Sequence, residues 1–167
     1  MKIIGLAGWS GAGKTTLVAK LLPVLIARGL SVSTIKHAHH AFDVDTPGKD
    51  SFVHRQAGAR EVLVASATRF ALMAEHRGGP EPELPALLAR LAPVDLVVVE
   101  GFKRHPHPKI EVFRAALGKP MLWPGDATIV AVASDQTVPG CDRAVVGLDD
   151  VEAIADWVVT RAGWHTH

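Results

Sequence analysis

The sequence has few of the features expected of a disulfide-bonded, membrane-anchored or secreted protein. Its 167 residues include one cysteine, Cys141, which cannot form an internal disulfide. No apolar run reaches the roughly 18 residues that a membrane helix requires. The apolar residues at 3–6 lead into a glycine-rich motif and not into a cleavage site, so no secretory signal is expected. We predict a cytoplasmic protein with no membrane partner.

A strong charge of one sign is also missing. Eighteen Lys and Arg residues balance 17 Asp and Glu residues, which gives a formal net charge of +1. Such scattered charges create no field for a polyanion, so we expect no nucleic-acid partner. Hydrophobic residues make up 48% of the chain, and its length suits one folded unit. We predict a single nucleotide-binding domain over residues 1–167.

What the sequence does contain is a complete phosphate-binding loop. Residues 8–15 read GWSGAGKT, between an apolar run at 3–7 and a helical pattern at 16–28. This is the G-x-x-x-x-G-K-[ST] pattern in its strand–loop–helix context, where backbone N–H groups point at phosphate oxygens. Lys14 would reach the β- and γ-phosphates, and the Thr15 hydroxyl would hold Mg²⁺. The predicted nucleotide contacts are Gly11, Ala12, Gly13, Lys14, Thr15 and Thr16.

Short apolar runs alternate with helical patterns along the rest of the chain. This alternation predicts an α/β fold of the three-layer phosphate-loop NTPase type, with a mainly parallel sheet flanked by helices. Two adjacent short strands predict an added β-hairpin. The expected strands are 3–7, 30–35, 61–65, 70–74, 96–99, 109–113, 128–133 and 145–146. The expected helices are 15–28, 50–58, 83–91 and 149–161.

Polar side chains follow several of the predicted strands, where ligands bind in open parallel sheets. Glu100 comes directly after the buried run 96–99 and is predicted to hold Mg²⁺ or to orient the attacking water. We therefore assign catalytic roles to Lys14 and Glu100. Lys36 ends the second strand and is predicted to contact phosphate, and Asp45 in the following loop is a candidate metal residue.

Base recognition is expected after the strand at 128–133. Asp135 could accept two hydrogen bonds from the N1–H and 2-amino edge of guanine, which adenine lacks. The usual guanine-reading pattern Asn-Lys-x-Asp is absent. The alternative is that Asp135 only caps a turn. On the basis of Asp135, we predict that the chain binds GTP in preference to ATP.

Two other activities remain open from the residues alone. The histidines His37, His39 and His40 suggest a nickel or zinc metallochaperone GTPase, although no cysteine lies nearby and no helical spacing relates them. A small-molecule kinase is the second alternative, but the stretch at 77–82 is short for an arginine-bearing lid. No arginine finger is evident. Candidates by elimination are Arg55, Arg60, Arg69, Arg77 and Arg104.

Four segments together carry a resemblance to a known family. They are the loop at 8–16, the segment IKHAHH at 35–40 with DVD at 43–45 and PGKDS at 47–51, the segment VEGFK at 99–103, and PKIEV at 108–112. The chain resembles the molybdopterin-guanine dinucleotide biosynthesis protein B (MobB) family over nearly its whole length. The Lys-His and Glu-Gly-Phe-Lys segments make the match specific.

The resemblance implies a doubly wound phosphate-loop fold that binds GTP with Mg²⁺. It also implies a homodimer, built partly through an added β segment for which the hairpin at 61–74 is our candidate. The implied role is that of an accessory protein in molybdenum cofactor biosynthesis, a slow GTPase that assists the guanylyltransferase joining GMP to molybdopterin. The missing arginine finger is consistent with slow hydrolysis.

Overall fold

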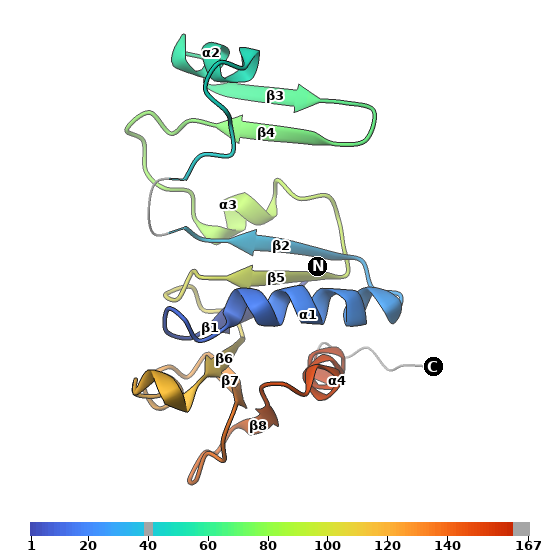
Figure 1. Cartoon of the computed structure of the whole chain (residues 1–167), viewed down its shortest axis with the longest axis vertical. Coiled ribbons are helices and arrows are strands. Elements are labelled where there is room, and N and C mark those ends of the chain that lie inside the picture. The colour runs from blue at the N-terminus through green and yellow to red at the C-terminus, as the bar shows by residue number, and fades with distance from the viewer. Residues whose placement is uncertain (39–41, 162–167) are drawn as a thin grey trace. The chain divides into compact units, whose positions relative to one another are not determined.

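The computed structural model describes residues 1–38 and 42–161, and the chain divides into two compact units (Figure 1). We call Met1–His37 with Leu87–His167 the sheet unit, and Ala38–Ala86 the hairpin unit. A compact unit need not fold alone, so the single-domain prediction for residues 1–167 stays a prediction. In the part of the chain that is described, no helix has the length and apolar character needed to cross a membrane.

The sheet unit is built on six parallel strands in the order β2-β5-β1-β6-β7-β8. β1 therefore lies inside the sheet, and the loop that follows it opens at the carboxyl edge. The elements are β1 (Lys2–Ala7), α1 (Lys14–Ala27), β2 (Val32–Lys36), β5 (Leu96–Glu100), β6 (Lys109–Phe113), β7 (Ile129–Ser134), β8 (Ala144–Gly147) and α4 (Val151–Arg161), with 3-10 turns at Ala115–Leu117 and Trp123–Gly125.

Burial on both faces explains why the inner strands are continuous apolar runs. Leu96, Val97, Val98 and Val99 of β5 are all fully buried. On one face the strands pack against α1 and α4, which contact each other over the same apolar cluster (Figure 1). From α1 the cluster takes Leu17, Leu21 and Leu25, and from α4 it takes Ile154, Ala155, Val158 and Val159. The i, i+4 spacing of the α1 leucines thus fixes the helix on the sheet.

The predicted elements are present, and the differences lie at their ends. α1 continues through Pro23. β2 begins at Val32 and not at Leu30, because the Leu30 N–H still donates to the Leu25 carbonyl past Gly29, which ends the helix with a positive φ. The predicted helix at 83–91 is shorter: α3 (Leu84–Leu88) gives way to turns in which each N–H donates three residues back, as from Arg90 to Leu87.

The hairpin unit consists of α2 (Asp50–Gln56), β3 (Glu61–Ala65) and β4 (Phe70–Ala74). The two strands form the antiparallel hairpin that the sequence predicts, and the structure adds their register, with Leu63 opposite Leu72. Ser66 closes the connecting turn, since its N–H donates to the Arg69 carbonyl at 2.8 Å. Among its described residues, only the apolar side chains of Val62 and Leu84 are buried. This unit therefore has little apolar core of its own.

Candidate functional site

The phosphate loop connects β1 to α1 and follows from its glycines. At Gly8, a Cβ would lie 2.5 Å from the Val112 carbonyl oxygen of β6, so only glycine lets the loop leave the sheet there. Gly13 has a φ of 96° and caps α1 at its N-terminus. The Gly13 carbonyl accepts from the Leu17 N–H at 2.8 Å, which starts the helix directly behind the loop. The amino end of α1 therefore faces the carboxyl edge of the sheet.

Lys14 is folded over this loop. Its Nζ donates to the carbonyl oxygens of Gly8 at 3.0 Å and Trp9 at 2.9 Å. Partial burial lowers the pKa of Lys14, the neighbouring Glu100 raises it, and the cations of Lys103 and Lys36 lower it further. The ammonium is thus held at the loop beside one carboxylate, which attracts it, and two further lysines, which repel it. An anion seated on the loop would relieve that repulsion.

Thr15, Glu100 and Lys36 come together beside the loop, as the sequence predicts for a Mg²⁺ and γ-phosphate site. The Thr15 hydroxyl donates to the Glu100 carboxylate, with its oxygen 3.2 and 3.1 Å from Oε1 and Oε2. Lys36 Nζ lies 3.5 Å from the Thr15 hydroxyl oxygen and 3.8 Å from Glu100 Oε1. The sheet register explains the cluster, because Lys36 and Glu100 are paired at the ends of β2 and β5.

Asp135 lies just past the end of β7 and is partly engaged. Its Oδ1 accepts from the Ala115 N–H at 3.0 Å, and its Oδ2 lies 4.0 Å from Nη1 of Arg114. The carboxylate therefore stabilises the turn after β6, the alternative role raised above. One oxygen remains for a ligand, so its reading of guanine stays a prediction.

Arg114 is a residue that the sequence reasoning missed. A Cβ on Gly13 would lie 3.5 Å from Arg114 Nε, which places the guanidinium directly beside the phosphate loop. The available signal was its position immediately after the predicted strand 109–113. Its relevance depends on β6 being the neighbour of β1, which the sequence did not reveal.

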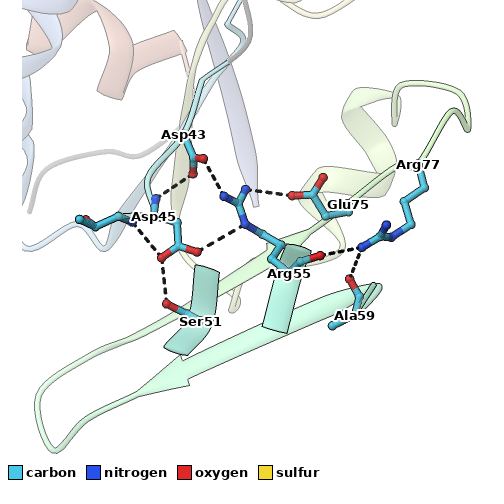
Figure 2. Close-up of polar contacts among 8 residues, drawn as sticks. Asp43, Asp45, Ser51, Arg55, Ala59, Glu75 and Arg77 are labelled. Atoms are coloured by element: carbon cyan, nitrogen blue, oxygen red, sulfur yellow. Dashed lines mark hydrogen bonds and ion pairs between the residues drawn. The ribbon is translucent and has the colours of Figure 1, made fainter. Parts of the chain in front are cut away.

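Asp45 belongs to the hairpin unit, and its carboxylate makes hydrogen bonds and an ion pair with residues of that unit (Figure 2). Its Oδ1 accepts from the Thr46 N–H at 3.0 Å and from the Ser51 hydroxyl at 2.8 Å, and its Oδ2 lies 3.4 Å from Arg55 Nε. Two further carboxylates, those of Asp43 and Glu75, contact the same guanidinium at 2.6 and 2.9 Å. The metal role of Asp45 stays a prediction.

His37 is the only member of the predicted histidine group within the described residues, since His39 and His40 lie outside them. The imidazole ring stacks on Phe102 with centroids 4.6 Å apart, and the backbone N–H of His37 donates to the Glu100 carbonyl at 2.7 Å. Gly101 permits this close approach, because a Cβ there would lie 2.5 Å from the His37 Cβ. Over residues 1–38 and 42–161, no group of His, Cys, Asp or Glu is arranged to hold a metal ion.

A parallel sheet with a glycine-rich phosphate loop after its first strand defines the class: a phosphate-loop α/β protein. Residues 3–135 match the family model of MobB, molybdopterin guanine dinucleotide synthesis protein B. Because that match covers most of the chain, the protein belongs to the MobB family, and the resemblance found in the sequence is confirmed.

Relatives and solved structures agree with this assignment. The molybdopterin-guanine dinucleotide biosynthesis adapter protein of Escherichia coli is 46% identical over 94% of this chain and 91% of its own length. The adapter protein of Haemophilus influenzae is 42% identical over 93% and 86%. A crystal structure of molybdopterin-guanine biosynthesis protein B superposes with a TM-score of 0.77 at 29% identity, over 96% of this chain and 99% of that one. The predicted α/β fold with its added hairpin is confirmed.

Proposed function

We propose that this protein is a GTP-binding adapter in the biosynthesis of molybdopterin guanine dinucleotide, which assists a partner guanylyltransferase and hydrolyses GTP slowly. The relatives that match over nearly their whole length are named as adapters of this biosynthesis. The nucleotide would lie on the loop formed by residues 8–15, with its phosphates on the amino end of α1. The phosphoryl end of GTP would then face Lys14, Lys36 and Glu100.

The observation that carries this proposal is the cluster of Thr15, Glu100 and Lys36 at the mouth of the loop. Mg²⁺ in such sites takes few protein oxygens and completes its shell with phosphates and water. One hydroxyl and one carboxylate within 3.2 Å of each other fit that requirement. When bound, the ion would neutralise phosphate charge. Lys36 would add a cation on the same side.

The cations near the loop support the proposal that hydrolysis is slow. Arg114 is placed to contact a phosphate, but the Asp135 carboxylate stands 4.0 Å from it and offsets part of its charge. Arg55 and Arg77, two of the arginines considered above, are engaged in the hairpin unit (Figure 2). A phosphate-loop protein without a committed arginine hydrolyses GTP slowly. The nucleotide would serve chiefly as a bound signal or cargo.

We also propose that the hairpin forms the contact of a homodimer. Leu63, Leu72 and Phe70 lie on one face of the two-stranded ribbon, and they are 60%, 42% and 72% exposed. A two-stranded ribbon with an uncovered apolar face is marginal in water, and a second copy would cover it. Phe70→Glu is expected to convert a dimer to monomers in sedimentation. A dimer of unchanged strength in this variant would contradict the proposal.

The nucleotide site is tested by the Mg²⁺ dependence of GTP binding, measured by calorimetry on the wild type and on Thr15→Val. Wild type is expected to bind GTP more tightly with Mg²⁺, and Thr15→Val is expected to lose that gain. Thr160→Val removes the same hydroxyl from the exposed side of α4 and serves as the matched control. A wild type that binds no GTP would overturn the proposal.

The adapter role requires a second measurement. Purified protein is added to a molybdopterin guanylyltransferase, and formation of the dinucleotide cofactor is followed with GTP present. Stimulation that depends on the phosphate loop supports the proposal. Equal stimulation by Lys14→Ala would show that GTP on this chain is irrelevant to the partner.

A further inference from the structure

A tryptophan stands in the phosphate loop, where the motif itself requires no aromatic residue. The Trp9 indole N–H donates to the Pro120 carbonyl at 2.7 Å, which fixes the ring against the segment after β6. Lys103 Nζ and Lys119 Nζ each lie 5.9 Å from the centre of this ring. The two lysines come from different loops, one after β5 and one after β6. Three loops of the sheet unit thus converge on one aromatic ring.

We propose that Trp9, Lys103 and Lys119 form a docking surface for a carboxylate-rich segment of the partner protein, beside the bound nucleotide. This inference rests on the adapter function proposed above and specifies the chemistry by which the partner is recognised. We call these three residues the Trp9 platform. Trp9 is half-buried, and both lysines are exposed.

The charges around the platform are the first support. Within residues 1–38 and 42–161, neither Lys103 nor Lys119 has a carboxylate within ion-pair distance, whereas Lys36 pairs with Glu100. Lys103 is also close enough to Lys14 to disfavour its charged form. The face of the indole attracts each ammonium, but the like charges repel one another, and a bound anion would relieve that repulsion. The chain as a whole carries a net charge of only +1, so this concentration of cations is local.

The position of the platform favours a partner segment over the nucleotide itself. The phosphate loop already offers Lys14 and its backbone N–H groups to a triphosphate, with Arg114 and Lys36 beside it. Lys119 lies over the Trp9 ring, whereas the Lys14 ammonium is turned toward the Gly8 and Trp9 carbonyls of the loop. An anchored tryptophan with exposed flanking cations is typical of an interface in which the ring supplies affinity and the charges steer association.

The platform is tested with a hexaglutamate peptide, titrated into the protein at low ionic strength while tryptophan emission is recorded. Wild type is expected to give a saturable change that disappears at high salt. Lys119→Glu is expected to weaken the peptide at least about tenfold, because it replaces attraction by repulsion at an exposed site. The emission change should be absent in Trp9→Phe, which assigns it to Trp9 among the four tryptophans.

Lys2→Glu is the matched control, because it makes the same charge change at the exposed amino-terminal start of β1. Equal peptide affinity in Lys119→Glu and Lys2→Glu, or no binding by wild type, would overturn the proposal. Inorganic pyrophosphate in place of the peptide distinguishes a small-anion site: if Lys119→Glu weakens pyrophosphate as much as hexaglutamate, the assignment to a protein segment is wrong.

The same variants separate this inference from the adapter function. GTP affinity of Lys119→Glu is expected to equal that of wild type, so a loss of peptide binding there is not a loss of the nucleotide site. The titration is run with and without Mg²⁺ and GTP. If wild type binds hexaglutamate but no GTP, the platform stands and the proposed nucleotide function fails.

Discussion

The two units of the chain are held together by different forces. In the sheet unit, strands such as β5 bury every apolar side chain, and α1 and α4 cover one face. In the hairpin unit, Arg55 joins three carboxylates while Phe70 and Leu63 remain exposed. Apolar burial provides most of the free energy of folding, whereas a largely buried ion-pair network contributes little net but is costly to break. The comparison indicates that apolar packing dominates the sheet unit, whereas the hairpin unit depends on the ion pairs of Arg55 and on a partner for its apolar face.

The largest effect is expected from Lys14→Ala, which should remove measurable GTP binding. The change deletes the ammonium that donates to the Gly8 and Trp9 carbonyls of the loop. Loss of a charged phosphate contact weakens binding by about 100-fold or more. Calorimetric titration with GTP and Mg²⁺ provides the measurement. Hydrogen exchange over 38–86 should remain that of wild type, and unchanged GTP affinity would refute the assignment of the site.

Arg55→Met should disorder the hairpin unit and leave the sheet unit intact. The guanidinium contacts Asp43, Asp45 and Glu75, and Arg77 donates to the Arg55 carbonyl at 2.9 Å (Figure 2). Methionine retains the unbranched aliphatic part of the side chain but leaves three carboxylates without their shared cation. Hydrogen exchange should rise across α2, β3 and β4 and should stay that of wild type in the sheet unit. Arg60→Met, an exposed arginine four residues past α2, gives the control. If protection within 38–86 is the same in both variants, the network does not hold this unit together.

The free energy of unfolding is expected to depend on pH because of one histidine in the sheet unit. His107 is buried against Gly5, and within the described residues its Nε2 has no hydrogen-bond partner. Burial first, and then the charges of Lys109 and His105, lower the pKa of His107 from 6.5 to about 4, although Asp126 acts in the opposite direction. The unfolded chain therefore binds a proton between pH 6.5 and 4 that the folded chain does not.

This difference in protonation decides whether stability rises or falls with pH. The stability contributed by neutral His107 is fully present above pH 6.5 and is lost as the pH falls toward 4, by about 3 kcal/mol in all. Denaturant titrations at pH 7 and pH 4.5 measure the free energy of unfolding. His107→Gln should show a smaller decrease than wild type over this interval. Identical decreases would mean that His107 is protonated in the folded state.

A smaller effect is expected on the GTP hydrolysis proposed above. Glu100→Gln keeps the shape of the side chain that accepts from Thr15, but it removes the charge that would hold Mg²⁺. GTP binding should be retained, while Mg²⁺-dependent hydrolysis should fall by about tenfold or more. Phosphate release under single-turnover conditions provides the measurement. Equal rates in the two proteins would exclude Glu100 from hydrolysis.

How far the sequence predicts this molecule depends on whether a feature is local. The phosphate loop, the hairpin and β6 at Lys109–Phe113 were predicted with their bounds, since each is specified by neighbouring residues. The cluster of Thr15, Glu100 and Lys36 was also predictable, because strands of a parallel sheet end at one edge. Arg114 beside Gly13 was not, since that contact depends on the strand order. The contact of Trp9 with Pro120 joins residues 111 positions apart, and no local pattern indicates it.

The smallest expected effect concerns base choice and separates two roles of one carboxylate. If Asp135 reads guanine, Asp135→Asn should reduce the preference for GTP over ATP by about tenfold, because an amide presents a donor where guanine requires an acceptor. If Asp135 only holds the Ala115 N–H, the variant should lose stability while the ratio of the two affinities stays constant. Competition binding with both nucleotides measures the ratio, and thermal unfolding measures the stability. Arg114→Lys serves as the comparison, since it alters the neighbour of Asp135 and should weaken both nucleotides alike. A ratio that changes equally in both variants would mean that the base is recognised elsewhere in the sheet unit.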